Sequence, residues 1–244
     1  MKRSNLTNLL LSCLGIKMEK VTYCFDVDGT LTPSRSVMDE QFRKEFIEFA
    51  KKNDACLVTG SDYPKTLEQV GQEVIDACSF VFNCCGNEVR TGNHIRYQST
   101  WKPGGTLLLA LEYEKRKSDF PIRTGKHIEN RVGMVNFSIV GRNATKEDRA
   151  AYIKWDEERN ERLNIASHLR KLFSEIDCTI AGETGLDIYP KGKDKSQVKE
   201  WIENKLVFFG DRCEYGGNDY PLAKVADVVY DVDNWQETRK ILGY

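Results

Sequence analysis

The chain lacks a long apolar run and an excess of either charge. Its hydrophobic segments fall well short of the roughly 20 residues that a membrane-spanning helix needs. The 36 Lys and Arg residues balance 37 Asp and Glu residues among 244, so there is no bulk positive field for nucleic acid. We therefore expect a cytoplasmic protein with no nucleic-acid partner and no membrane partner.

The chain also lacks a zinc-type cysteine pair. Its eight cysteines show no Cys-x-x-Cys spacing, which argues against a structural zinc site. Most of them lie in apolar runs, so we expect buried, reduced thiols in a cytosolic protein.

The N-terminal residues carry a weak targeting pattern. Lys2 and Arg3 precede the apolar run 9–14, as in a signal peptide, but this run is too short and has no small-residue cleavage site. We expect residues 1–17 to be a disordered extension, and we assign no function to them.

Hydrophobic patterns along the chain alternate between strand and helix. Strands are predicted at 21–25, 55–59 and 79–83, separated by helices at 38–52 and 64–77. Such alternation indicates a parallel sheet with helices on its faces.

This alternation is interrupted after residue 97 and resumes after Pro190. The interruption is predicted to contain a helix at 106–117, a strand at 134–140, a long helix at 145–173 and antiparallel strands at 178–181 and 186–189. The resumed part is predicted to contain a helix at 196–204, a strand at 206–209, a helix at 221–224 and a strand at 228–230. We therefore predict a Rossmann-like α/β core at 18–97 and 191–244, with an inserted α+β cap at 98–190.

Two carboxylates follow the first predicted strand, where open parallel sheets bind their ligands. Asp26 and Asp28 are two residues apart, so in an extended chain both can face one reacting centre. One carboxylate can attack phosphorus while the other exchanges a proton with the leaving oxygen. We assign these roles to Asp26 and Asp28 respectively.

Further polar groups follow other predicted strands. Thr59 and Ser61 offer hydroxyl and N–H groups to phosphoryl oxygens, and Lys195 can neutralise transferring charge. Asp211 and Asp219 offer hard oxygens suited to Mg²⁺. Each residue alone fits a turn or a solvated surface, but their joint placement at strand ends favours phosphoryl transfer.

This set of residues resembles the haloacid dehalogenase superfamily. In that superfamily the first aspartate is phosphorylated, the second is the acid and base, and Mg²⁺ bridges carboxylate and phosphate. The resemblance implies metal ligands at Asp26, Asp28, Asp211 and Asp219, and a catalytic role for Lys195.

The insert resembles the cap of eukaryotic-type phosphomannomutases. The matching segments of the insert are Arg131-Val-Gly-Met-Val-Asn136, Gly141-Arg142-Asn143 and Asp187-Ile-Tyr-Pro190, and Phe208-Phe-Gly-Asp211 in the core agrees with the same family. Guanidinium groups suit phosphate recognition. The resemblance implies that the sugar and its distal phosphate bind at Arg35, Arg131, Arg142, Arg149, Asp187 and Gly185, the last of which stands where the family usually has serine.

The second resemblance implies a phosphohexomutase that interconverts hexose 6-phosphate and hexose 1-phosphate, with mannose as the expected sugar. An aspartyl-phosphate and an activating hexose 1,6-bisphosphate would take part. The alternative is a phosphatase of the same superfamily that transfers the phosphoryl group from sugar phosphate to water. The cap arginines favour the mutase, and Thr59 favours the phosphatase. The leucine-rich segment 106–111 fits either a homodimer face or the core of the cap.

Overall fold

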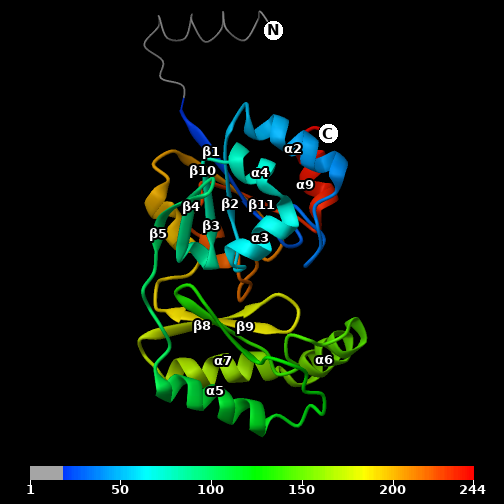
Figure 1. Ribbon diagram of the computed structural model, residues 1–244, viewed down its shortest axis with the longest axis vertical. Helices are drawn as coiled ribbons and strands as arrows, with labels where there is room; N and C mark the ends of the chain where they lie inside the picture. Colours follow the sequence, from blue (N-terminus) through cyan, green and yellow to red (C-terminus); the bar gives the residue numbers. More distant parts are fainter. Residues whose placement is uncertain (1–18) are drawn as a thin grey trace, which may run out of the picture.

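The computed structural model describes residues 19–244, which form two separate sheets (Figure 1). One sheet has seven strands in the order β11-β10-β1-β2-β3-β4-β5, and the other has four in the order β6-β7-β9-β8. The segments predicted as core form the first sheet, and the predicted insert contains the second. The α/β fold class is confirmed, whereas the domain bounds stay a prediction. The predicted N-terminal extension lies outside the described residues.

The larger sheet is parallel at its centre and antiparallel at one edge. Its strands are β1 (Val21–Asp26), β2 (Asp54–Val58), β3 (Phe80–Asn83), β4 (Glu88–Thr91), β5 (His94–Gln98), β10 (Lys205–Gly210) and β11 (Val228–Asp231). β1 pairs in parallel with both β2 and β10. The hairpin formed by β4 and β5 adds two antiparallel strands beside β3, and the sequence patterns did not predict it.

Helices cover both faces of this sheet. They are α2 (Glu40–Ala50), α3 (Tyr63–Val70), α4 (Gln72–Ala77), α8 (Tyr220–Ala223), α9 (Trp235–Ile241) and the 3-10 segments η1 (Cys84–Gly86) and η2 (Lys195–Trp201). Successive strand residues point to opposite faces. Phe25 therefore packs with Phe42 and Phe46 beneath α2, while Cys24 packs with Phe208 on the other face. Burial on both faces holds β1 in place, so that Asp26 emerges at its carboxyl end.

The cap sheet is antiparallel and is covered by helices on one face. Its elements are α5 (Gly105–Lys117), β6 (Ile128–Arg131), β7 (Met134–Phe137), α6 (Lys146–Arg159), α7 (Glu161–Leu172), β8 (Ile176–Ala181) and β9 (Gly185–Pro190). The predicted pairing of β8 with β9 is confirmed. In Figure 1 this sheet lies between the larger sheet and the helices α5 and α7. The face of the cap sheet without helices is thus the one turned toward the core.

Two predicted helices are each interrupted by a residue with a positive φ. The helix expected at 145–173 begins at the predicted Thr145 cap but divides at Asn160, whose φ is 52°. The helix expected at 64–77 divides at Gly71, whose φ is 84°. Asn and Gly tolerate positive φ better than other residues do, but the hydrophobic period continues across both breaks and hides them.

The segment expected to be a helix at 196–204 is instead the 3-10 segment η2, which begins at Lys195. The Asp194 side chain accepts a hydrogen bond from the N–H of Ser196, 2.8 Å away, and caps the segment. This cap starts the turn at Lys195 and directs its side chain into the protein, where it is buried.

Among the described residues, no helix is long and apolar enough to cross a membrane.

Candidate active site

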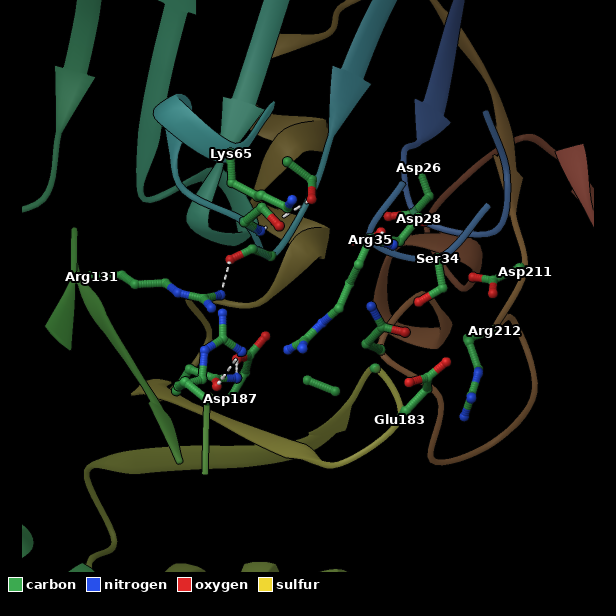
Figure 2. Close-up of a pocket in the computed structure, with 18 residues that line it drawn as sticks. Asp26, Asp28, Ser34, Arg35, Lys65, Arg131, Glu183, Asp187, Asp211 and Arg212 are labelled. Carbon is green, nitrogen blue, oxygen red and sulfur yellow. Dashed lines mark hydrogen bonds between the residues drawn. The ribbon is translucent and has the colours of Figure 1, made fainter. Parts of the chain in front are cut away.

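The candidate site lies where the parallel strands end, between the larger sheet and the cap (Figure 2). Asp26 is the last residue of β1, and Asp211 directly follows the neighbouring strand β10. In the sheet, β1 lies between β2, the next strand along the chain, and β10, which comes after the cap. The strand order therefore reverses at β1. Such a reversal opens a crevice at the carboxyl ends of the strands, and a cavity of about 210 Å³ lies there.

Three carboxylates and one ammonium group form the floor of this site. Oxygen atoms of Asp26, Asp211 and Asp219 all lie within 4.8 Å of one another. The Lys195 ammonium donates to Asp26 Oδ1 at 2.5 Å and to Asp219 Oδ1 at 2.6 Å. With Lys195, Asp26 and Asp219 all almost fully buried, solvent screens these charges weakly.

The pKa shifts in this cluster follow from burial and from like charge. Burial, and next to it the charge of Asp219, raise the pKa of Asp26 well above its ordinary value. The same two causes raise the pKa of Asp211 to about 7. For Lys195 burial acts to lower the pKa, but the charges of Asp219 and Asp26 outweigh it and raise the pKa. Three carboxylates therefore face one ammonium that stays charged.

This excess of negative charge fits a divalent cation. Asp26, Asp211 and Asp219 supply the hard oxygen ligands that Mg²⁺ prefers. The carboxylate of Asp28 is not one of the three. Its Oδ1 accepts hydrogen bonds from the Arg35 N–H at 2.6 Å and from Gln69 Nε2 at 2.8 Å. Its role as a metal ligand stays a prediction, as do the other assigned roles.

Arg35 lies on the core side of the cavity, and Figure 2 shows its side chain directed into it. Its backbone φ is 56°, which is rare for arginine. Partial burial of the guanidinium, with Arg142 and Arg149 facing it, lowers its pKa to about 10. Arg35 thus brings a third positive charge toward the two cap arginines, as an anion-binding site requires.

Carboxylates on the cap pair with the three predicted cap arginines. Arg131 and Arg142 both contact Glu129 Oε2, at 2.6 Å and 3.1 Å. Arg149 donates twice to Glu183 Oε2, at 3.0 Å and 2.6 Å. These carboxylates hold the guanidinium groups in place, but an incoming phosphate must compete with them.

The cap touches the core at Gly60. Arg131 Nη1 donates to the Gly60 carbonyl at 2.7 Å, and a Cβ at Gly60 would lie 2.8 Å from Asp187 Oδ2. Asp187 is in turn held by Asn136 Nδ2, which donates to its Oδ1 at 2.7 Å. Burial raises the pKa of Asp187, while Arg131 acts against this shift. Gly60 therefore permits a close approach of cap and core.

Most of the predicted site residues line the cavity. They are Asp26, Asp28, Arg35, Thr59, Ser61, Arg131, Arg142, Asp187 and Asp211. Lys195 and Asp219 lie buried beneath Asp26, and Arg149 reaches the cavity only through Glu183. Gly185 does not line it, and a Cβ there would meet Asn136 Nδ2 at 2.9 Å.

Several lining residues were not predicted. They are Ser34, Gly60, Lys65, Asn136, Ala181, Gly182, Glu183, Arg212 and Asn218. Asn136 ends the segment that carries Arg131, and Asn218 directly precedes Asp219, so their polar side chains were a usable signal. Glu183 stands in the turn between two cap strands, and no pattern in the sequence places that turn against the core.

The fold of the chain places it in a known structural class of proteins. The chain has a haloacid dehalogenase-type α/β fold with a cap. An IMP-bound, N-terminally truncated IMP-nucleotidase from Plasmodium falciparum superposes with a TM-score of 0.64 at 16% identity, over 96% of this chain and 70% of that one. A haloacid dehalogenase-like hydrolase from Bacteroides thetaiotaomicron gives 0.57 at 15% identity, over 92% and 98%. At such identities the likeness concerns the fold alone.

Sequence similarity defines the family. The model of the family described as eukaryotic phosphomannomutase matches residues 42–243. A phosphomannomutase from Saccharomyces cerevisiae is 33% identical over 232 residues, which cover 89% of this chain and 91% of the relative. One from Spinacia oleracea is 35% identical over 228 residues, covering 88% and 92%. This chain belongs to the eukaryotic phosphomannomutase family.

Proposed function

We propose that this protein is a Mg²⁺-dependent phosphohexomutase that interconverts mannose 6-phosphate and mannose 1-phosphate. The observation that carries the proposal is the two-sided cavity, with a carboxylate nucleophile on the core wall and guanidinium groups on the cap wall. A sugar that carries one phosphate at Asp26 can place a second phosphate against Arg35 and Arg142. Membership of the phosphomannomutase family supports mannose as the sugar.

The residues of the core have distinct tasks in this reaction. An Asp26 oxygen attacks the phosphorus of a hexose bisphosphate, and the bond from phosphorus to the sugar oxygen breaks. Asp28 donates a proton to that leaving oxygen and takes one from the hydroxyl of the next acceptor. Bound Mg²⁺ would neutralise charge that develops on the phosphoryl oxygens. The charged Lys195 holds Asp26 in position throughout.

Hexose 1,6-bisphosphate is the expected activator, because Asp26 must be phosphorylated before a monophosphate can receive a phosphoryl group. Transfer to the free hydroxyl of the monophosphate then makes a new bisphosphate. If this molecule turns around in the cavity, its other phosphate reaches Asp26, and an isomerised monophosphate is released. The arrangement of one nucleophile opposite several arginines supports such an exchange.

Phosphorus NMR tests this function. The protein is mixed with Mg²⁺, mannose 1-phosphate and a catalytic amount of hexose 1,6-bisphosphate. We expect mannose 6-phosphate to appear without free phosphate, and a long lag when the bisphosphate is omitted. Free phosphate as the sole product would overturn the mutase in favour of a phosphatase. A glucose 1-phosphate arm measures sugar preference.

Substitution of Gly60 by alanine should increase hydrolysis at the expense of transfer. The new methyl group would lie 2.8 Å from Asp187 Oδ2, and the hydrogen bond to Asn136 keeps Asp187 from moving aside. The cap would then close incompletely, and cap closure is what excludes water. We expect the ratio of free phosphate to transferred phosphate to rise about tenfold, as a shift of 1.4 kcal/mol between the two acceptors would produce.

The matched control for this substitution is Gly105→Ala. Gly105 begins α5, and no atom lies within 4 Å of a Cβ built there. Its product ratio should equal that of the wild type. An unchanged ratio in Gly60→Ala, measured in the same phosphorus spectra, would show that this contact does not control water access.

We also propose a homodimer through the cap. Leu107 and Leu111 of α5 are buried in the cap core, whereas Leu109 is 71% exposed and Tyr113 is 58% exposed. One face of α5 is therefore packed in the cap core, and another exposes the apolar side chains of Leu109 and Tyr113. Leu109→Glu should convert a dimer to a monomer in light scattering after gel filtration, with Lys117→Glu on the same helix as the control. A wild-type monomer, or a dimer that survives Leu109→Glu, would contradict this interface.

A reducing compartment such as the cytosol is the expected location. The cysteines of the described residues are unpaired, and all except Cys213 are buried. Burial raises the pKa of the Cys78 and Cys85 thiols, as it does for Cys56 and Cys178. Buried thiols with high pKa values act as small apolar side chains, which supports this expectation.

A further inference from the structure

Gln69 is a buried carboxamide directed at the segment that carries Asp28 and Arg35. It lies on α3 and is 2% exposed. Its Nε2 donates to Asp28 Oδ1 at 2.8 Å. Neither its residue type nor its position was singled out by the sequence patterns, and it does not line the cavity.

Gln69 also holds the rest of this segment against α3. Its Nε2 lies 3.4 Å from Thr32 Oγ1 and 3.5 Å from the Ser36 carbonyl. Its main-chain carbonyl accepts the N–H of Met38 at 2.8 Å. Gln69 thus contacts the segment 28–38 near both of its ends and at its middle.

The carboxamide of Gln69 contacts this segment through its nitrogen. Among the described residues, no protein group donates to its buried Oε1. A methionine has a similar shape but no donor, so replacing Gln69 by methionine removes the contact with Asp28 and largely keeps the volume.

The contact is made to one particular oxygen of the Asp28 carboxylate. Two donors, Gln69 Nε2 and the Arg35 N–H, end on Oδ1 of the Asp28 carboxylate. Two hydrogen bonds to one oxygen fix the plane of the carboxylate. Oδ2 is then the oxygen left to face the cavity, which Asp28 lines.

We propose that Gln69 is a positioning residue that orients Asp28 for proton transfer to the leaving sugar oxygen. This inference rests on the acid and base role of Asp28 in the proposed function. Gln69 is not among the residues that line the cavity, so it would act through Asp28. Its effect should appear only in steps where the leaving group needs a proton.

Two phosphoryl donors separate positioning from general damage. A hexose 1,6-bisphosphate releases a sugar hydroxyl, which must be protonated as the bond breaks. Acetyl phosphate releases acetate, which needs no proton at neutral pH. We therefore compare the rates at which the two donors phosphorylate Asp26 in wild type, Gln69→Met and Gln69→Glu.

For Gln69→Met we expect phosphorylation by hexose 1,6-bisphosphate to slow about 10- to 100-fold, as misplacement of a catalytic group does. Phosphorylation by acetyl phosphate should stay within about threefold of the wild type, and the KM for mannose 1-phosphate should change as little, since the substrate contacts remain. Gln69→Glu has the shape of glutamine but brings a carboxylate against Asp28, so its loss with the bisphosphate should be at least as large. Gln41→Met, which removes an exposed glutamine on α2, should behave as wild type.

Equal losses with both donors would overturn the positioning role, and so would no loss with either. If Gln69→Met does not fold, Gln69→Glu is judged by the same comparison, with thermal unfolding as the check on folding. Failure of the proposed mutase looks different. The wild type would then release free phosphate from sugar phosphates, while the comparison of the two donors could still be made.

Discussion

Asp26→Asn is expected to abolish turnover and, without metal, to raise the melting temperature. Loss of the nucleophile removes the aspartyl-phosphate, and removal of a nucleophile can lower kcat by on the order of 10⁴-fold or more. Burial and the charge of Asp219 raise the pKa of Asp26. A carboxyl whose pKa is higher in the folded than in the unfolded state destabilises the fold at neutral pH, because ionising it costs more in the folded protein. The neutral amide removes both the cost of burying this charge and its repulsion from Asp219.

The rise in melting temperature that a given gain in free energy produces depends on chain length. A relief of about 1 kcal/mol would raise Tm by about 2–4 °C in a chain of this size. Differential scanning fluorimetry in EDTA measures it. Lys195 keeps its bond to Asp219 in the variant, so the variant does not leave this buried ammonium without a partner.

Added Mg²⁺ provides the second part of this test. A cation that binds the folded state alone stabilises it by mass action, and the variant lacks one of the three carboxylates that would hold it. Mg²⁺ should therefore raise the Tm of the wild type more than that of Asp26→Asn. The control Asp233→Asn alters an exposed aspartate and should leave both activity and Tm unchanged. A variant that retains turnover, or that melts below the wild type in EDTA, would contradict the charge distribution described here.

The core of the fold could be predicted because its signals are local. Each central strand is a short apolar run, and the polar groups that matter follow directly at its end, as Asp26 and Asp211 do. Parallel pairing then brings these ends to one edge of the sheet. The hairpin β4–β5 escaped prediction because β5 is exposed throughout, and an edge strand exposed on both faces has no hydrophobic alternation.

Partners that lie far apart in the sequence account for what was missed. Glu183 meets Arg149 across 34 residues, and Gln69 meets Asp28 across 41. Each pairing depends on how a loop returns to a distant element, and no local pattern encodes it. Gly185 was chosen by similarity to a serine position, but Asn136 fills the space that a side chain would need. The sequence therefore predicted residues at the ends of the strands better than the partners that hold them in place.

Lys195→Met should cause the largest loss of stability among single substitutions at the site, together with loss of activity. The ammonium is the cation that contacts both Asp26 and Asp219. Its removal leaves buried carboxylates in mutual repulsion, and breaking a buried ion pair from one side costs about 3–5 kcal/mol. Methionine has a similar length, so the loss of charge dominates over loss of volume. Urea denaturation in EDTA measures the free energy of unfolding.

Lys199→Met is the matched control, because Lys199 also lies on η2 but pairs at the surface with Asp227, 3.3 Å away. A surface pair contributes at most about 1 kcal/mol. The double variant Asp26→Asn with Lys195→Met completes the cycle. Because the amide removes one of the repelling charges, the double variant should be more stable than Lys195→Met alone, and the two effects should not add. If Lys195→Met loses no more stability than Lys199→Met, or if Asp26→Asn does not rescue it, then Lys195 does not balance the charge of the acidic cluster.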